Sequence, residues 1–377
     1  MHEYSLGVDK KRMGPIVLKY GSSLLVGEAS ELDRAHIARI AAAVASTDRD
    51  VVIVSSGAVA AGLAGLGRRD PPTRRDQRRA AAAIGQRRLM SIWGDAFAEM
   101  GREVGQVLLT NDCLTDREKY VAASETLRSL LRAGIVPIVN ENDAVTAGDA
   151  VVGDNDNLAA VTAALVHADL LALFTDVPGV FDADPVVDPT ARVIAFAESA
   201  EALRSRCFNK KAGVSVGGME TKLEAAEHAG RLGIPTMIAS GADTEALRSA
   251  LTHERAGTWI AASSRPLKAR RHWMAQRKGL AGTLVVDSGA VQALQRRASL
   301  LPSGVTAVHG RFSRGDVVAV VDDLGVEQAR GIVRFDDRDV ERIRGLHSID
   351  VERVLGPGRG SVVMRPDRMV LSVGEGR

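Results

Sequence analysis

The sequence predicts an α/β protein with a mainly parallel sheet, followed by a smaller β-rich domain. From Ile16 to about Ile260, short β-branched runs alternate with longer stretches rich in alanine and leucine. That alternation is typical of βαβ units. After about Gly279, short strand-like runs are separated by glycine and aspartate turns, which is typical of a compact β-rich domain.

A polar, basic segment without helical or strand periodicity separates the two patterns. We therefore expect a first domain over residues 1–264, a linker over 265–278 and a second domain over 279–377. A chain of 377 residues is longer than one average domain, which agrees with two domains.

Six short apolar runs in the first domain predict core strands that are buried on both faces. They are residues 15–20, 50–56, 104–110, 135–140, 170–176 and 234–240. Residues 30–45 and 76–100 predict helices, and Ser30 and Asp33 have the spacing of a capping box at the start of the first. Five runs after Gly279 predict strands, at residues 282–294, 304–310, 316–322, 329–335 and 360–366.

Composition excludes several classes of protein. The 49 basic and 47 acidic side chains leave a net charge of +2, so the whole chain has no field that favours nucleic acid or a membrane surface. The two cysteines, Cys113 and Cys207, lie far apart without metal-ligand spacing, which fits a reducing cytoplasm. The most apolar helical stretch contains His167 and Asp169, so we expect no membrane span.

Several polar loops directly follow predicted strands, where open α/β sheets bind their ligands. In the first loop, Lys19 is followed by Gly21, Ser22 and Ser23. Glycine lets backbone N–H groups approach a ligand and lysine supplies a mobile charge, which suits a phosphate. Many strands simply end in lysine, so this motif alone favours an ordinary strand end.

The second loop places Ser56 and Gly57 before an alanine-rich helix whose N-terminus would favour an anion. A turn of small residues for close packing of helix on sheet explains the same pattern equally well.

Two further loops are crowded with Asn and Asp side chains and give the strongest local signal. One such cluster is ordinary in turns, but two in one domain suggest polar groups that converge on a ligand. Their members are Asn140, Glu141, Asn142, Asp143, Asp154, Asn155, Asp156 and Asn157.

Two remaining motifs are weak by themselves. Gly217 and Gly218 precede a helix that carries Lys222, which would reach a phosphate or lie exposed on the helix. Thr175 and Asp176 end a strand and would bind a nucleotide or only cap a turn.

Taken in order over Ile16–Lys222, the motifs LKYGSSLL, VIVSSGAVAAG, GQVLLT, PIVNENDAV, GDNDNLAA, LLALFTDVPGVF and GGMETK resemble the glutamate 5-kinases of the amino acid kinase family. The segment from Gly279 resembles the PUA domain that follows the kinase domain in the bacterial enzymes. The resemblance implies a three-layer αβα sandwich with a mainly parallel sheet, the amino acid kinase fold, plus a small β-rich PUA domain.

The resemblance also implies an activity, the ATP-dependent phosphorylation of the γ-carboxylate of L-glutamate, the first step of proline biosynthesis. It assigns phosphoryl contacts to Lys19 and Lys222 and a lysine-positioning role to Asp156. A carboxylate is already a nucleophile at neutral pH, so this chemistry needs alignment and charge neutralisation rather than a general base.

The family pattern carries over further binding roles. Glutamate contacts fall on Ser56, Gly57, Asp143 and Asn155. Nucleotide contacts fall on Lys19, Gly21, Ser22, Thr175, Asp176, Gly217, Gly218, Met219, Glu220, Thr221 and Lys222. We expect Mg²⁺ to be bound through nucleotide oxygens, with no protein side chain assigned as a metal ligand.

The family further implies inhibition by proline and a homo-oligomer. Four positions depart from its pattern: Tyr20, Ala122, Asp182 and Val216. Tyr20 stands where a small aliphatic is usual and could crowd the phosphate loop, whereas Val216 removes a possible hydroxyl contact to nucleotide.

Two alternatives remain at this point. The first is a kinase of the same fold with another acceptor, such as aspartate, N-acetylglutamate or UMP. The second is an RNA-binding protein, because PUA domains commonly bind RNA. From Gly279 onward 14 arginines stand against 13 acidic residues, which is too balanced for a surface that follows a phosphate backbone. We therefore do not expect a nucleic acid partner.

Overall fold

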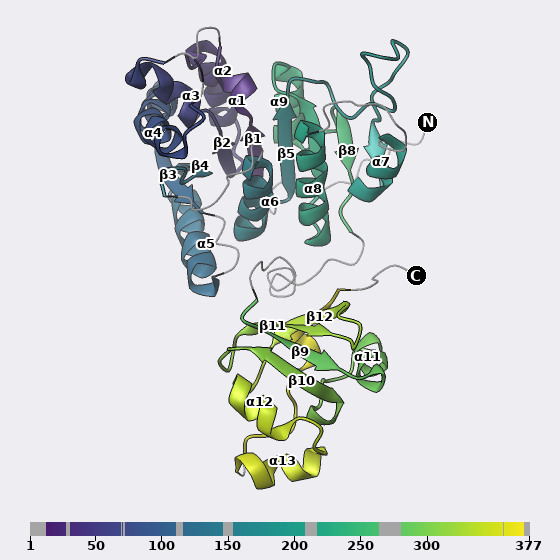
Figure 1. Ribbon diagram of the computed structural model, residues 1–377. Coiled ribbons are helices and arrows are strands. Elements are labelled where there is room, and N and C mark those ends of the chain that lie inside the picture. Colours follow the sequence, from purple (N-terminus) through teal and green to yellow (C-terminus); the bar gives the residue numbers. More distant parts are fainter. Residues whose placement is uncertain are drawn as a thin grey trace. The chain divides into compact units, whose positions relative to one another are not determined.

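A computed structural model describes residues 13–27, 31–68, 70, 72–110, 116–145, 154–207, 217–263, 280–356 and 358–372. The chain divides into two compact units, Met1–Pro266 and Leu267–Arg377 (Figure 1). The segment 265–278, expected to be a linker, lies outside the described residues.

The N-terminal unit contains an eight-stranded sheet with the order β3-β4-β2-β1-β5-β7-β8-β6. Neighbouring strands are parallel except β7 and β8, which are antiparallel. The strands are β1 (Ile16–Tyr20), β2 (Val51–Ser55), β3 (Val104–Leu109), β4 (Val136–Glu141), β5 (Leu170–Thr175), β6 (Phe196–Ala197), β7 (Thr236–Ser240) and β8 (Thr258–Ile260). The six predicted strands and the mainly parallel sheet are thus confirmed, and β6 and β8 were not predicted. Burial on both faces was wrong for β3, because it lies at the edge of the sheet and is partly exposed.

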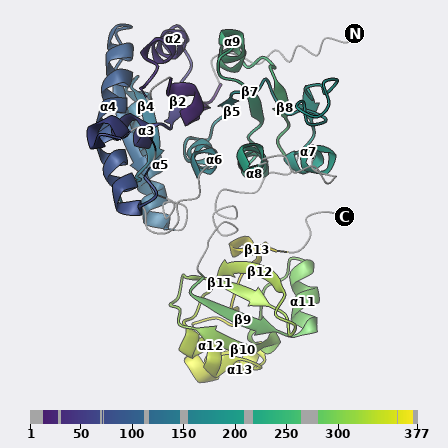
Figure 2. The same ribbon diagram turned by 45° about the horizontal axis from the view of Figure 1, so that its top comes forward.

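Helices cover both faces of this sheet (Figure 2). One face packs on α2 (Arg34–Ala45), α4 (Arg75–Ala98) and α9 (Thr244–Thr252), and the other on α5 (Arg117–Arg132), α6 (Asp154–Val166), α7 (Ala200–Cys207) and α8 (Gly217–Arg231). Successive residues of a strand alternate between the two cores, as the pleat requires. None of the described helices has the length and apolar character needed to cross a membrane.

The start of α2 differs from the predicted capping box. The helix begins at Arg34, and Asp33 is its N-cap residue, whose carboxylate accepts a hydrogen bond from the backbone N–H of His36 at 2.9 Å. The prediction placed Asp33 three residues inside the helix. Asp is itself a strong N-cap residue, so the later of two plausible starts is used.

Two short helices follow strands β1 and β2 and belong to the loops of interest. They are α1 (Ser22–Leu25) and α3 (Ala58–Leu63), and α3 continues into the 3₁₀ turn η3 (Ala64–Leu66). Helix α3 packs directly on α4 through glycines. A Cβ atom added at Gly85 would lie 1.8 Å from the carbonyl oxygen of Ala58, and one added at Gly62 would lie 1.8 Å from that of Ala81.

The C-terminal unit contains a five-stranded mixed sheet with the order β10-β9-β11-β12-β13. Its strands are β9 (Gly282–Val286), β10 (Val305–Gly310), β11 (Val317–Val321), β12 (Glu327–Ile332) and β13 (Met369–Leu371). Its helical elements are α11 (Ser288–Gln295), η5 (Pro302–Gly304), α12 (Asp337–Ile343), α13 (Ser348–Leu355) and η6 (Pro366–Arg368). This β-rich unit has its own core, which includes Leu284, Val318 and Met364.

Two strand predictions in this unit were wrong in part. The run 282–294 is a strand only to Val286, because Asp287 caps α11 by accepting from the N–H of Ala290 at 2.7 Å. The run 360–366 forms only an isolated bridge between Leu300 and Met364. The last strand is β13 instead, a short edge strand whose three residues carry too little pattern to be recognised.

The contact between α3 and α4 leads to a stability prediction. Gly85→Ala should lower the free energy of unfolding by about 1–3 kcal/mol, because the new methyl group must push helix backbone apart. Gly94→Ala in the same helix is the matched control, since its Cβ would meet only Val104 at 4.0 Å. There we expect no loss, or a gain of up to about 1 kcal/mol.

Chemical denaturation followed by tryptophan fluorescence measures both variants, because Trp93 and Trp259 lie in this unit. Equal effects of the two substitutions would contradict the close helix contact.

Candidate active site

The polar loops identified in the sequence meet at one edge of the N-terminal sheet. Strands β1, β2, β4 and β5 are mutually parallel, so their carboxyl ends lie at the same edge. Lys19 and Tyr20 end β1, Ser55 ends β2, Glu141 ends β4 and Thr175 ends β5. This edge is where open α/β sheets bind ligands.

The pleat of β1 decides where Lys19 points. Leu18 and Tyr20 belong to the core under α2 and α4, whereas Val17 belongs to the core under α6 and α8. Lys19 shares the side of Val17 and therefore faces α6 and α8. The residue as a whole is 5% exposed.

Asp156 joins Lys19 and Lys222 in one buried ion-pair cluster, which we call the lysine–aspartate triad. Its carboxylate lies 2.6 Å from Nζ of Lys19 and 3.2 Å from Nζ of Lys222. Thr221 donates its hydroxyl hydrogen bond to the same carboxylate at 2.8 Å. Lys222 also donates to the carbonyl oxygen of Gly218 at 3.0 Å, which joins the start of α8 to the triad.

Burial and mutual charge set the ionisation of the triad. Burial, reinforced by the neighbouring charge of Lys222, lowers the pKa of Lys19 against the opposing pull of Asp156. Burial alone would raise the pKa of Asp156, but Lys19 and then Lys222 outweigh it and hold that pKa below its ordinary value. The carboxylate is therefore ionised at neutral pH.

The glycine of the first loop lies directly beside the triad. A Cβ atom at Gly21 would come 3.6 Å from Nζ of Lys19, so glycine keeps the space next to the ammonium group open. Ser22 begins α1 immediately after it. At the end of β5, which pairs with β1, the Thr175 hydroxyl donates to the carboxylate of Asp176 at 3.0 Å. The Asp176 side chain is exposed.

A chain of amide and hydroxyl groups lies next to the triad. The side chain of Asn155, the neighbour of Asp156 on α6, donates to the hydroxyl of Ser56 and also to Oδ1 of Asn140 at 3.2 Å. Asn140 in turn donates to Oε1 of Gln86 at 2.9 Å. The loop after β2, the end of β4 and the start of α6 are thereby brought together.

Gln86 was not among the predicted site residues. It is 9% exposed and reaches from α4 to Asn140 in β4. A glutamine in an alanine-rich, buried helical run was the only signal that could have identified it. Gly57 has φ of +102°, which favours glycine and turns the chain from β2 into α3. Asp143 lies half-buried in the turn after β4.

Two residues assigned to nucleotide binding have other partners. Glu220 forms an ion pair with Arg204 of α7 at 2.6 Å, and Met219 packs against the core. Gly217 and Gly218 begin α8. Val216, one of the departures from the family pattern, lies outside the described residues.

Tyr20 does not crowd the phosphate loop. Its ring is 1% exposed and stacks on Phe174, with centroids 4.7 Å apart, on the face of the sheet opposite Lys19. The expectation of crowding was wrong because neighbouring strand residues point to opposite faces. Burial raises the pKa of the Tyr20 hydroxyl well above its ordinary value, so the ring stays neutral.

The triad carries two positive charges and one negative charge in a site almost closed to water. Such an excess of buried positive charge attracts an anion more strongly than the same charges would in water. Among the described residues, no group of three or more His, Cys, Asp or Glu side chains has the arrangement of a metal site.

Two family models match the chain. Residues 14–240 match the model of the amino acid kinase family, and residues 282–355 match that of the PUA domain. Among solved structures, isopentenyl phosphate kinase from T. acidophilum in its product complex has 19% identity, covering 65% of this chain and 99% of that chain, with a TM-score of 0.47.

Three curated relatives are named glutamate 5-kinase. That of Shewanella sediminis is 41% identical, covering 94% of this chain and 97% of the relative. That of Bordetella pertussis is 42% identical, covering 95% and 96%. That of Geobacter sp. is 42% identical, covering 96% and 98%. On its sequence and its two matched domains, the chain belongs to the glutamate 5-kinases of the amino acid kinase family that carry a C-terminal PUA domain.

Proposed function

We propose that the chain transfers the γ-phosphoryl group of ATP to the γ-carboxylate of L-glutamate and forms L-glutamyl 5-phosphate, the first step of proline biosynthesis. The single observation that carries this proposal is the lysine–aspartate triad, a buried positive site at the ligand-binding edge of the sheet. The names of the relatives supply the acceptor.

The triad suits phosphoryl transfer to a carboxylate. Because the acceptor is already ionised, the protein must bring two anions together and stabilise the charge on the transferring group. Lys19 and Lys222 reach the carboxylate of Asp156 from two elements, β1 and α8, so two ammonium groups are available to a phosphoryl group bound beside it. Asp156 keeps the two like charges from moving apart.

We assign the remaining residues around this centre. Gly21 and Ser22, Thr175 and Asp176, and the segment Gly217–Lys222 would bind the nucleotide. Within that segment Glu220 and Met219 would contribute only backbone groups, because their side chains are used elsewhere. Glutamate would lie against Ser56, Gly57, Asn155 and Asp143. The Asn155 amide already holds the Ser56 hydroxyl in place for such a contact.

Mg²⁺ would enter with the nucleotide and neutralise part of the phosphoryl charge. The buried carboxylate of Asp156 is already engaged by Lys19, Lys222 and Thr221. We therefore assign the ion's ligands to nucleotide oxygens, in keeping with the usual preference of Mg²⁺ for phosphate and water.

A substrate panel tests the proposal. Formation of γ-glutamyl hydroxamate is measured with glutamate, ATP, Mg²⁺ and hydroxylamine, beside ADP release with aspartate, N-acetylglutamate and UMP. Of the four acceptors, we expect only glutamate to be phosphorylated. Turnover with another acceptor would agree with a kinase but would refute glutamate as its substrate.

Three further properties follow from family membership and are proposed on that basis. Proline at millimolar concentration should reduce the rate by binding at or over the glutamate pocket, and an unchanged rate would refute that inhibition. The chain should form a homo-oligomer, which light scattering would detect. A cytoplasmic location agrees with the two widely separated cysteines.

Removal of Lys222 should mainly affect chemistry. Lys222→Ala should lower kcat by ~10²-fold or more, because it removes charge stabilisation from the transition state. Lys119→Ala, which changes an exposed lysine on α5, is the control and should leave kcat unchanged. Asp143→Ala should chiefly raise the KM for glutamate. If Lys222→Ala changed only KM, the assigned roles would be wrong.

Removal of the central carboxylate should affect stability in a pH-dependent way. Asp156→Asn leaves two buried ammonium groups unpaired and should lower the free energy of unfolding by about 3–5 kcal/mol at neutral pH. Because the pKa of Asp156 is lowered in the folded state, its contribution is present above the ordinary carboxyl pKa of about 4. It is lost as the pH falls through the folded-state pKa.

The difference between wild type and Asp156→Asn should therefore narrow below about pH 4, as measured by chemical denaturation across pH. Asp95→Asn is the control, since Asp95 forms only an exposed pair with Arg34 at 3.8 Å. It should change stability by less than about 1 kcal/mol. A difference for Asp156→Asn that grew in acid would contradict the ionised triad.

A further inference from the structure

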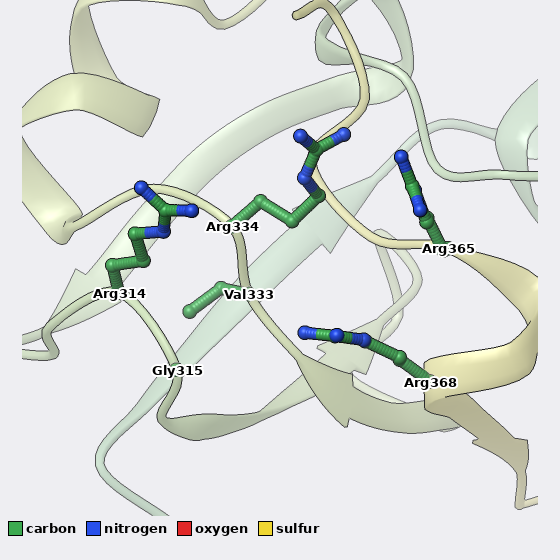
Figure 3. A pocket seen from close by; sticks show the side chains of 6 residues that line it. All are labelled: Arg314, Gly315, Val333, Arg334, Arg365 and Arg368. Carbon is green, nitrogen blue, oxygen red and sulfur yellow. The ribbon is translucent and has the colours of Figure 1, made fainter. Parts of the chain in front are cut away.

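The C-terminal unit contains a pocket lined by four arginines, which we call the arginine pocket. Its volume is about 300 Å³, and it is lined by Arg314, Gly315, Val333, Arg334, Arg365 and Arg368. Figure 3 shows Arg314 on one side, Arg365 and Arg368 on the other, and Arg334 between them. No part of the function proposed above uses this pocket.

The arginines come from three segments that backbone hydrogen bonds hold together. Arg314 lies between β10 and β11, Arg334 follows β12, Arg365 precedes η6, and Arg368 is the last residue of η6. The N–H of Gly315 donates to the carbonyl of Val333 at 3.0 Å, and the N–H of Arg334 donates to that of Val363 at 3.0 Å.

Val333 and Val363, which make these contacts, are almost completely buried. The backbone around the pocket is therefore fixed before any ligand arrives.

Nearby carboxylates do not neutralise the pocket. Within the described part of the unit, none of the four guanidinium groups forms an ion pair. Asp336 and Asp339 line a second hollow that shares Arg314 and Arg334. Asp336 caps α12 by accepting from the N–H of Asp339 at 2.8 Å, and Asp339 pairs with Arg359 at 2.8 Å, so among the described residues neither carboxylate forms an ion pair with the four arginines.

The four charges also act on one another. Burial, followed by the positive charges of Arg365, Arg314 and Arg368, lowers the pKa of Arg334. An arginine stays protonated at neutral pH in spite of such a shift, so the repulsion remains and opposes folding. Binding of an anion in the pocket would relieve this repulsion and stabilise the folded unit.

We propose that the arginine pocket binds the phosphoryl groups of a small phosphorylated metabolite. Guanidinium groups match phosphate geometry with paired N–H donors, and several at one point suit a ligand with two adjacent phosphoryl groups. The volume lies at the lower end of the range for small-molecule sites.

The charge distribution favours a compact ligand over a nucleic acid strand. From Gly279 to the C-terminus 14 arginines stand against 13 acidic residues, so this segment has a net charge of only about +1, and four of its arginines line the pocket. A protein that follows a phosphate backbone needs positive charge along an extended track. Here the positive charge gathers at one point.

Hydrogen exchange of the full chain with inorganic pyrophosphate tests the proposal, because it locates binding by segment. We expect pyrophosphate, but not chloride at equal ionic strength, to protect residues 311–316, 330–335 and 361–370. Protection in the N-terminal unit is measured on other peptides, so pyrophosphate that binds near Lys19 and Lys222 does not affect the measurement on the arginine pocket. The result does not depend on the kinase activity.

Three variants make the test specific. Arg334→Gln and Arg368→Gln should each raise the pyrophosphate concentration needed for half-maximal protection by about tenfold or more. Each substitution removes charge-assisted hydrogen bonds to the ligand. The matched control is Arg353→Gln on α13, which removes an exposed arginine paired with Asp350 at 3.2 Å and should change nothing. Unchanged exchange of β11 without ligand confirms that each variant is folded. Arg368 is exposed, so its variant decides the result if Arg334→Gln fails to fold.

Three results would overturn the proposal. They are an absence of protection at millimolar pyrophosphate, protection that survives both pocket substitutions, and protection by a single-stranded oligonucleotide without any by pyrophosphate. The last would indicate a nucleic acid surface.

Discussion

The N-terminal unit depends on one buried carboxylate between two lysines. Asp156 is 1% exposed and bonds to Lys19, Lys222 and Thr221. It thereby links β1, α6 and α8, three elements that are far apart in the sequence. Without the carboxylate the two ammonium groups would repel each other in a poorly hydrated site, and without the lysines the carboxylate would be buried alone.

The surrounding structure serves to hold this triad at the edge of the sheet. The pleat of β1 points Lys19 to one face of the sheet and Tyr20 to the other. Lys19 supplies a charged group to the site, and the buried ring of Tyr20 fixes the strand in the opposite core. The close glycine contact between α3 and α4 places the Ser56 loop beside Asn155. Stable packing thus positions polar loops, and the loops in turn define the candidate site.

Much of the fold could be predicted from local patterns, because buried parallel strands are continuous apolar runs. All six predicted strands of the first unit are present. The short strands β6, β8 and β13 could not be predicted, since two or three residues carry no periodicity and depend on tertiary pairing. The start of α2 was misplaced because two capping residues compete within four positions.

The candidate site was predictable in its residue types and less so in its contacts. Lys19, Asp156 and Lys222 were identified by motif order, and the structure brings them together. The partnership of Glu220 with Arg204 and the support of Asn140 by Gln86 depend on helices that only the folded chain brings close. The arginine pocket could not be predicted for another reason. Its four arginines come from three separate loops, and the nearly balanced charge of the segment from Gly279 gives no sign that they gather at one place.

The most direct test of this account is the charge state of buried Lys19 at neutral pH. The chain has only nine lysines, so ¹³Cε labelling and an NMR titration, with assignment by lysine-to-arginine substitution, can follow each one. We predict that Lys19 is protonated at pH 7 and loses its proton at a lower pH than an exposed lysine, because burial lowers its pKa. A neutral Lys19 at pH 7 would contradict a triad with excess positive charge.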